Sequence, residues 1–265
     1  MARIKKGHRL VGIGKWRLWK YFAKNIKIRP HLPDTRLLSE NTFQSFLYKY
    51  ESIFIKPWDG YGGEGIYKVW RKNQNYLIVK ERGEPETYSD VGQLYSSLKS
   101  NIGNKRQYII QQAVDLALIE ERPFDIRIMF LRYKGDWKYA GMVAKVAGKD
   151  SIITNIKRGK GYTVNVDEAL RKSFNWDINK IKDAKKKMVS LGYRTCYHFD
   201  RYKRYSRMGL DIALDKEGRL WMFDQNTVPA LFLFKKNKTT YKKIQAILRN
   251  QKNNKMKKSS FPQLT

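Results

Sequence analysis

Residues 208–226 read MGLDIALDKEGRLWMFDQN, and this stretch decides the fold. Two apolar runs flank a turn at residues 216–218, which predicts a β-hairpin. Because strand neighbours point to opposite faces, Asp211 lies away from the apolar side chains beside it, while Asp224 and Asn226 share a face of the second strand. Three oxygen ligands on one side of a hairpin suit magnesium. An ordinary polar outer face is the alternative, although Asp and Asn are poor strand residues.

Two segments upstream of this hairpin read YIIQQAVDL, at 108–116, and RPFDIRI, at 122–128. Asp125 and Arg127 share one face of the strand predicted at 124–131. An Asp can accept a hydrogen bond from a ribose hydroxyl, and an Arg can hold phosphate. A structural ion pair is the alternative, and this segment alone favours that interpretation.

The segment 55–66, IKPWDGYGGEGI, places Lys56 at a strand end before four glycines in six residues, from Gly60 to Gly65. Glycine lets backbone N–H groups turn toward a phosphate without a steric penalty, and lysine supplies a point charge. No Gly-Lys-Ser/Thr opens a helix, so the loop is not a P-loop. A hairpin turn with additional glycines is an equally good interpretation of this segment alone.

A fourth segment has Lys145 on a strand, followed by Asn155 and a glycine-flanked turn at 159–161. By itself this order of a cation, an amide and a turn indicates little.

Charge distinguishes the composition of the 265 residues. There are 55 Lys and Arg against 24 Asp and Glu, a net charge of +31. Such a charge attracts nucleic acid, anionic membrane, an acidic polypeptide or nucleotide phosphates, or serves solubility alone. Cys196 is the only cysteine, which excludes an intrachain disulfide and indicates a reducing compartment. The three histidines are scattered, no apolar run reaches the roughly 20 residues of a spanning helix, and we expect a soluble cytosolic protein.

The chain predicts an α+β protein of antiparallel sheets, because strand patterns are mixed with few helices. Helices are expected after a cap at Asn41 and near 89–99, 177–191 and 240–248. We divide the chain into a basic N-terminal segment at 1–35, a domain at 36–250 and a basic, flexible tail at 251–265.

In this order and spacing, the four segments resemble the ATP-grasp superfamily, and most closely the YheC/YheD-like ATP-grasp proteins associated with bacterial spore coats. Residues 110–116 with 122–127 are the most specific part, and the similarity runs from Leu32 to Pro229. The resemblance implies an ATP-grasp fold, in which two small lobes with antiparallel sheets enclose a nucleotide cleft and join at a hinge near 111–116.

The resemblance also implies roles for the matching residues. It implies nucleotide contacts, with ribose for the last of them, at Lys56, Gly60, Gly62, Gly63, Gly65, Gln111, Gln112, Ala113, Val114 and Asp125. It implies that Arg127 and Lys145 face the γ-phosphate or an acyl phosphate, with Asn155 near the transferred group. It implies that Asp211, Asp224 and Asn226 hold Mg²⁺. Three features depart from the family pattern. Asp224 replaces a glutamate, and the high charge does not follow from the family. Only about 50 residues precede the strand of Lys56, whereas many members have a distinct N-terminal domain that often supplies a second nucleotide-contacting lysine, which is not identifiable here.

The implied activity is an ATP-dependent carboxylate–amine ligase that works through an acyl phosphate. The charge suggests an acidic amino acid added to an acidic protein or peptide, in the cytoplasm and in association with the developing spore coat. One alternative is a basic nucleic-acid-binding or scaffold protein with a degenerate ATP-grasp fold, because basic and aromatic residues interleave at 16–24 and 193–207. Another is an ATP-dependent phosphotransferase.

Overall fold

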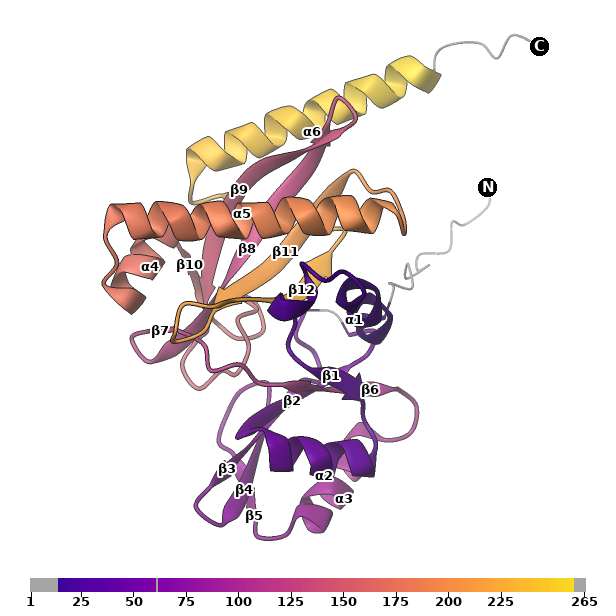
Figure 1. The fold of residues 1–265 in the computed structure, drawn as a ribbon, viewed down its shortest axis with the longest axis vertical. Coiled ribbons are helices and arrows are strands. Elements are labelled where there is room, and N and C mark those ends of the chain that lie inside the picture. Colours follow the sequence, from indigo (N-terminus) through magenta and orange to yellow (C-terminus); the bar gives the residue numbers. More distant parts are fainter. Residues whose placement is uncertain (1–13, 61, 260–265) are drawn as a thin grey trace, which may run out of the picture.

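The structure is a computed structural model that describes residues 14–60 and 62–259, with side chains as far as Gln251. It contains two six-stranded sheets, each with its own hydrophobic core. Every strand pair in both sheets is antiparallel. The prediction of an α+β fold with two antiparallel lobes is therefore confirmed (Figure 1).

The small lobe occupies the lower half of Figure 1. Its sheet has the order β1-β6-β2-β3-β4-β5. The strands are β1 (Thr35–Leu37), β2 (Ser52–Pro57), β3 (Tyr67–Lys72), β4 (Asn75–Lys80), β5 (Glu86–Tyr88) and β6 (Tyr108–Gln112). Helices α2 (Glu40–Lys49) and α3 (Val91–Ile102) supply Phe43, Leu94 and Leu98 to its core. The cap of α2 is Ser39, which shares a capping box with Thr42, and is not Asn41 as the sequence predicts.

The large lobe has the strand order β10-β9-β8-β11-β12, with β7 paired to β8. The strands are β7 (Leu118–Ile119), β8 (Arg122–Tyr133), β9 (Asp136–Val146), β10 (Tyr162–Val164), β11 (Arg207–Leu214) and β12 (Leu220–Asn226). Helices α4 (Val166–Phe174) and α5 (Ile178–Asp200) cover one face, while η2 (Leu231–Phe234) and α6 (Lys238–Ser259) cover the other. The hairpin predicted at 208–226 is confirmed as β11 and β12.

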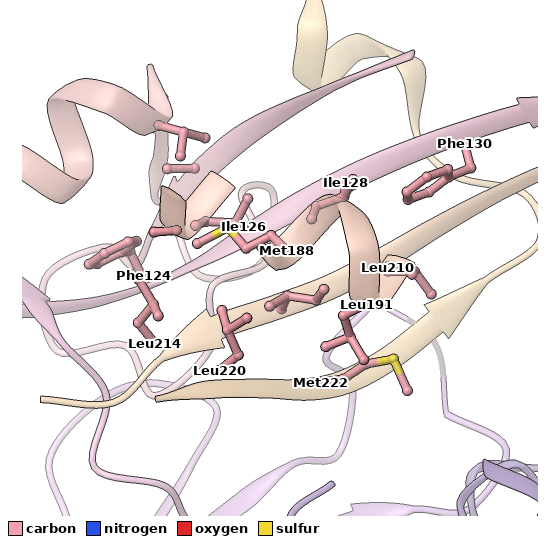
Figure 2. Packing of buried hydrophobic residues seen from close by; sticks show 14 of the residues in the cluster. Phe124, Ile126, Ile128, Phe130, Met188, Leu191, Leu210, Leu214, Leu220 and Met222 are labelled. Atoms are coloured by element: carbon pink, nitrogen blue, oxygen red, sulfur yellow. The ribbon is translucent and has the colours of Figure 1, made fainter. Parts of the chain in front are cut away.

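The middle of strand β8 is buried on both faces, which explains the continuous apolar run at residues 128–131. Ile126, Ile128 and Phe130 pack toward α5, whereas Met129 and Leu131 pack in the cluster under α6. Figure 2 shows the first set converging on the helix with side chains of β11 and β12. Burial of each such side chain contributes about 1.5–3 kcal/mol, so the large lobe is a stable frame for what its strands carry.

Part of the segment at 1–35 packs into this large lobe. Helix α1 (Lys15–Ala23) and the 3-10 turn η1 (Arg29–His31) place Leu18, Phe22 and Ile28 in the core under α5. The chain thus begins its described part in the large lobe, crosses to the small lobe at β1, and returns after β6 (Figure 1).

Two other helices differ from the sequence prediction. Helix α5 continues to Asp200, well beyond the predicted end near 191. Helix α6 continues to Ser259, into the segment for which the sequence predicts a flexible tail. The polar, lysine-rich composition obscured that end, because helix propensity is high for Lys and Gln even where no apolar face is present.

Candidate active site

A cavity of about 1480 Å³ lies between the two sheets. Most of the residues selected from the sequence line it: Lys56, Gly62, Gly63, Gln112, Ala113, Val114, Asp125, Arg127, Lys145, Asn155, Asp211, Asp224 and Asn226. Gly60 and Gln111 line a smaller neighbouring cavity, which also contacts Lys56 and Asp224. Gly65 lines neither cavity and packs against Pro57 instead. Side chains from both lobes thus meet around one space large enough for a nucleotide.

The glycine loop adopts a conformation that requires glycine. Gly62, Gly63 and Gly65 have φ angles of 71°, 83° and 68°, which other residues rarely adopt. A Cβ on Gly63 would lie 2.9 Å from Cδ1 of Ile153, so the loop rests closely on the large lobe. The backbone at Gly62 and Gly63 can therefore approach a ligand in the cavity, since neither residue has a side chain. Tyr61 lies outside the described residues.

Lys56 is held at the end of β2 by a hydrogen bond from its Nζ to Oε1 of Gln111, 2.6 Å long. Gln111 in turn donates from Nε2 to the hydroxyl of Thr35 at 2.9 Å. Burial, followed by the charge of Lys15, lowers the pKa of Lys56 from 10.5 to about 8. An anion beside this ammonium group would restore the lost solvation, so the site favours phosphate.

The hinge predicted near 111–116 is where the chain returns from the small to the large lobe. The backbone N–H of Ala113 donates to the carbonyl of Ser52, and that of Ala117 donates to Leu214 in the large lobe. Gln112, Ala113 and Val114 line the cavity between these two attachments. The side chain of Gln111 orients Lys56 and does not face the large cavity.

Four charged residues form what we call the buried cluster in the large lobe: Asp125, Arg127 and Lys145, which are buried, and Asp211, whose side chain is 16% exposed. Register explains the contacts, because Arg127 lies opposite Asp211 on β11 and Asp125 lies opposite Lys145 on β9. Arg127 donates to both oxygens of Asp211, at 2.6 and 2.9 Å. Lys145 Nζ lies 3.0 Å from Asp125 and 3.1 Å from Asp211.

Opposing effects set the charges in this buried cluster. Burial alone would raise the pKa of Asp211, but Arg127 and Lys145 outweigh it and hold that pKa well below its usual range. Burial raises the pKa of Asp125, which Lys145 opposes. Asp125 also accepts a 2.5 Å hydrogen bond from the hydroxyl of Thr154. The two cations are thus fixed in place at the wall of the cavity by their carboxylate partners.

The three predicted metal ligands lie on neighbouring positions of the hairpin. Asp211 is directly opposite Asp224, and Asn226 is opposite Gly209, with a bulge after Asp211. Asp224 accepts from Lys15 Nζ at 2.7 Å and from the backbone N–H of Gln225. Within the described residues no three His, Cys, Asp or Glu side chains gather as a metal site, and the predicted set consists of two carboxylates and the amide of Asn226. Two carboxylates and an amide oxygen fit magnesium, which takes its remaining ligands from phosphate and water.

Lys15 is the residue that the sequence did not reveal. It is the first residue of α1, and it lines the smaller cavity with Lys56 and Asp224. The spacing of Leu18 and Phe22 predicts a helix that buries one face, and Lys15 precedes the first of these by three positions. That pattern predicts which face of the helix is buried, but it does not show what the face packs against, so it could not place Lys15 next to the site.

A second contact between the lobes lies away from the hinge. The carbonyl of Glu81 accepts from the N–H of Ile152, and Gly83 donates to the carbonyl of Asp150. The carboxylate of Glu81 accepts from the N–H of Gly65 at 2.6 Å, and its other oxygen lies 3.2 Å from Arg158. Glu81 therefore joins the glycine loop to the large-lobe segment that also contains Asn155.

Comparison with known proteins extends these observations. A family model described as YheC/D like ATP-grasp matches residues 9–252. Endospore coat-associated protein YheD of Bacillus subtilis (strain 168) is 27% identical over 231 residues, which cover 83% of this chain and 49% of YheD. Endospore coat-associated protein YheC of the same organism is 28% identical over 224 residues, which cover 81% of this chain and 59% of YheC. The chain thus spans about half of these curated relatives.

A similar solved structure is the C-terminal domain of Pby1 from K. lactis, described as an ATP-grasp enzyme interacting with the mRNA decapping enzyme Dcp2. It is 15% identical, with a TM-score of 0.47 that covers 86% of this chain and 69% of that one. None of the helices in the described part of the present chain is long and apolar enough to cross a membrane.

Proposed function

The chain belongs to the YheC/D-like ATP-grasp family, and from this premise we propose that it is an ATP-dependent carboxylate–amine ligase. The observation that carries the proposal is the convergence on one cavity of Lys56, Arg127, Lys145, Asp211, Asp224 and Asn226. These residues come from both lobes and from distant parts of the chain. A protein that served only as a scaffold would have no need to bring them together.

The nucleotide would lie between the lobes. Lys56 and Lys15 would contact its phosphates, and the glycine loop would cover them. Residues 112–114 would hold the adenine, as the family resemblance implies. They line the cavity at the hinge, where backbone groups can form hydrogen bonds with the base. We place the ribose near Asp125 as the family resemblance implies, although its contacts to Lys145 and Thr154 also support a role in fixing the buried cluster.

In the proposed reaction, a carboxylate oxygen of the substrate attacks the γ-phosphorus of ATP. The new O–P bond forms as the bond to the β,γ-bridging oxygen breaks, and ADP leaves. An amine nitrogen then attacks the acyl carbon, the C–O bond to phosphate breaks, and the nitrogen loses a proton to give an amide. Arg127 and Lys145 would neutralise the migrating phosphoryl group, because their positions are fixed before the substrate arrives.

Asp211, Asp224 and Asn226 are the residues that would hold magnesium. The bound ion would draw charge from the phosphate oxygens and help to align the γ-phosphate. The substitution of Asp224 for the usual glutamate shortens one ligand by a methylene, and the direct opposition of Asp211 and Asp224 supports a compact site.

Water has to be excluded, because an acyl phosphate hydrolyses readily. The glycine loop is suited to this task, since Gly63 packs on Ile153 and Gly62 lies near the amide of Asn155. Asn155 accepts a hydrogen bond from the N–H of Arg158, which orients its amide next to the loop.

For the substrates we propose an acidic amino acid as one partner and an acidic protein or peptide as the other, because the net charge of +31 favours anionic partners. We place the reaction in the cytoplasm, in association with the developing spore coat, since two relatives are named endospore coat-associated proteins.

The test is ADP release from Mg-ATP in the presence of a panel of amino acids and acidic peptides. We expect substrate-stimulated turnover that Asp224→Ala abolishes and that Asp183→Ala, at an exposed position of α5, leaves unchanged. A product mass that shows an amide supports the ligase, whereas a phosphorylated acceptor would identify a phosphotransferase. Absence of nucleotide binding to the wild-type chain would overturn the proposal.

A further inference from the structure

The two basic and aromatic segments at 16–24 and 193–207 lie side by side in the structure. The hydroxyl of Tyr21 on α1 donates to the carbonyl of His198 on α5 at 2.6 Å, and the rings of Tyr21 and Tyr202 are 5.1 Å apart. Arg194 of α5 donates to the carbonyl of Lys27 at 3.2 Å. Helix α1 therefore borders the C-terminal end of α5, although the sequence separates them widely (Figure 1).

This juxtaposition creates what we call the α1–α5 surface. Its exposed or partly exposed cations include Lys20, Lys24, Lys27, Arg194, Arg201 and Lys203. It also exposes Ile26 and Tyr202, at 83% and 48% of their full areas. One side of the Tyr202 ring stacks on Phe199, with centroids 5.7 Å apart and planes within 16°. A large aromatic group thus remains half exposed among positive charges.

Few negative charges balance this surface. The sequence has no Asp or Glu before Asp34, and none of the six cations has a salt-bridge partner among the described residues. The nearby Asp200 is bound to Arg132 and Trp137, and Asp136 accepts from the hydroxyl of Tyr197. Both carboxylates are therefore already engaged, and the local potential stays positive.

We propose that the α1–α5 surface binds single-stranded nucleic acid. Clustered cations would contact phosphates, and the exposed Tyr202 ring would stack on an unpaired base. An acidic polypeptide would use the cations but has no use for an exposed aromatic face. A duplex keeps its bases stacked inside, so it would use the cations alone.

The surface goes beyond the proposed ligase activity and does not depend on it. Lys15 points from α1 to Asp224 in the cleft, whereas Lys20 and Lys24 are exposed on the outside of the same helix segment. Binding can therefore be measured without ATP, and its outcome says nothing for or against nucleotide chemistry.

The main experiment is fluorescence anisotropy of labelled 20-nucleotide oligo(dT) and oligo(U) with the full chain at several salt concentrations. The variant Lys24→Ala/Lys27→Ala/Arg201→Ala removes three cations from the surface. The matched control, Lys180→Ala/Lys182→Ala/Lys186→Ala, removes three exposed lysines from the other end of α5. We expect the first variant to weaken binding about tenfold or more and to reduce the salt slope by about 2, at roughly 0.7 for each phosphate contact.

The aromatic contribution is tested separately. Tyr202→Ala should weaken binding of oligo(dT) about fivefold or more, since a stacked base contributes about 1–3 kcal/mol. Tyr202→Phe should bind as the wild type does, because it keeps the ring. Tyr48→Ala is the control, since Tyr48 on α2 is 91% exposed and distant from the surface. Circular dichroism and the melting temperature establish that each variant folds.

Three results would overturn the proposal. One is equal loss of affinity in the two triple variants, which would mean that total charge alone attracts the oligonucleotides. Another is binding of a duplex as tight as that of the single strand with no effect of Tyr202→Ala. The third is binding of poly-glutamate, and not of oligonucleotides, with sensitivity to the surface variant, which would assign the surface to an acidic polypeptide.

Discussion

Two sets of ion pairs line neighbouring cavities between the lobes but are built differently. The buried cluster of Asp125, Arg127, Lys145 and Asp211 lies entirely on neighbouring strands of the large lobe. The pair of Lys15 and Asp224 joins a helix near the start of the chain to β12, and its side chains are 21% and 39% exposed. The first set is positioned by strand register, whereas the second depends on how a separate segment docks. We call the first set the rigid frame, because its side chains are fixed by the strands. We call the pair of Lys15 and Asp224 the yielding pair, because a ligand can separate its partners.

The largest expected effect concerns the buried cluster. Arg127→Ala should lower the free energy of unfolding by about 3–5 kcal/mol, because it leaves Asp211, whose side chain is only 16% exposed, with Lys145 as its one remaining counter-ion in the cluster. Urea denaturation followed by tryptophan fluorescence measures the change. The control is Arg122→Ala on the same strand, whose pair with Glu120 is solvent-exposed and contributes at most about 1 kcal/mol. If Arg127→Ala and Arg122→Ala destabilise the protein equally, the buried cluster is not a rigid frame.

The second prediction concerns Lys15. Lys15→Ala should weaken nucleotide binding roughly tenfold, as loss of a charged hydrogen bond to phosphate costs about 1.5–3 kcal/mol. It should change the free energy of unfolding by less than about 1 kcal/mol, because the pair with Asp224 is partly exposed. Isothermal titration with ADP and a denaturation curve give the two numbers. The opposite result, a less stable protein with unchanged affinity, would make Lys15 a structural residue.

The sequence predicted the rigid frame better than the yielding pair. Strand periodicity predicted that Asp125 and Arg127 share a face of β8 and that Asp224 and Asn226 share a face of β12. These residues and Asp211 line one cavity in the structure, as the family resemblance implied. The link between Lys15 and Asp224 spans 209 positions and depends on the packing of α1, which no local pattern reveals. The same holds for Glu81, whose left-handed conformation, with φ of 54°, directs it to the junction of the lobes.

The third prediction concerns the pH dependence of Lys56, whose pKa responds to the charges of Lys15 and Asp224. Its pKa of about 8 means that it loses its charge as the pH rises through 8, while an unfolded lysine stays charged to about 10.5. Between these pH values the unfolded chain binds one more proton than the folded chain, so the free energy of unfolding rises from about pH 8 to about 10.5. Below pH 8 the folded protein bears the full free-energy cost of a buried, charged Lys56.

Nucleotide affinity should change in the opposite direction. A bound phosphate favours the charged form of Lys56, so the dissociation constant for ADP should increase above pH 8, tenfold for each unit by which the nucleotide raises the pKa. Lys56→Arg keeps its charge and should bind ADP with little dependence on pH. Titration at pH 7, 8 and 9 in buffers of different ionisation enthalpy also measures the proton taken up. A wild-type affinity that stays constant from pH 7 to 9 contradicts the low pKa.

The smallest expected effect concerns Glu81 and Arg158, a second partly exposed pair that joins separate segments. Glu81→Gln keeps an acceptor for the N–H of Gly65 but removes the charge next to Arg158. We expect nucleotide dissociation to accelerate by only a few-fold, since such pairs contribute about 0–1 kcal/mol. Glu81→Ala should act more strongly, and hydrogen exchange at residues 62–66 should increase in it alone. The exposed Glu84→Gln is the control.

The two connections between the lobes lie next to each other, and this arrangement determines how the molecule can open. The N–H of Gln112, at the return crossing, donates to the carbonyl of Asp34, at the outward crossing. Two adjacent connections define an axis of rotation, and displacement grows with distance from an axis. Residues 112–114 lie at it, while the contact of Glu81 with Arg158 closes the opposite edge of the cleft. A nucleotide bound as proposed would therefore keep its base nearly stationary during opening, and its phosphate end would be the first to enter water.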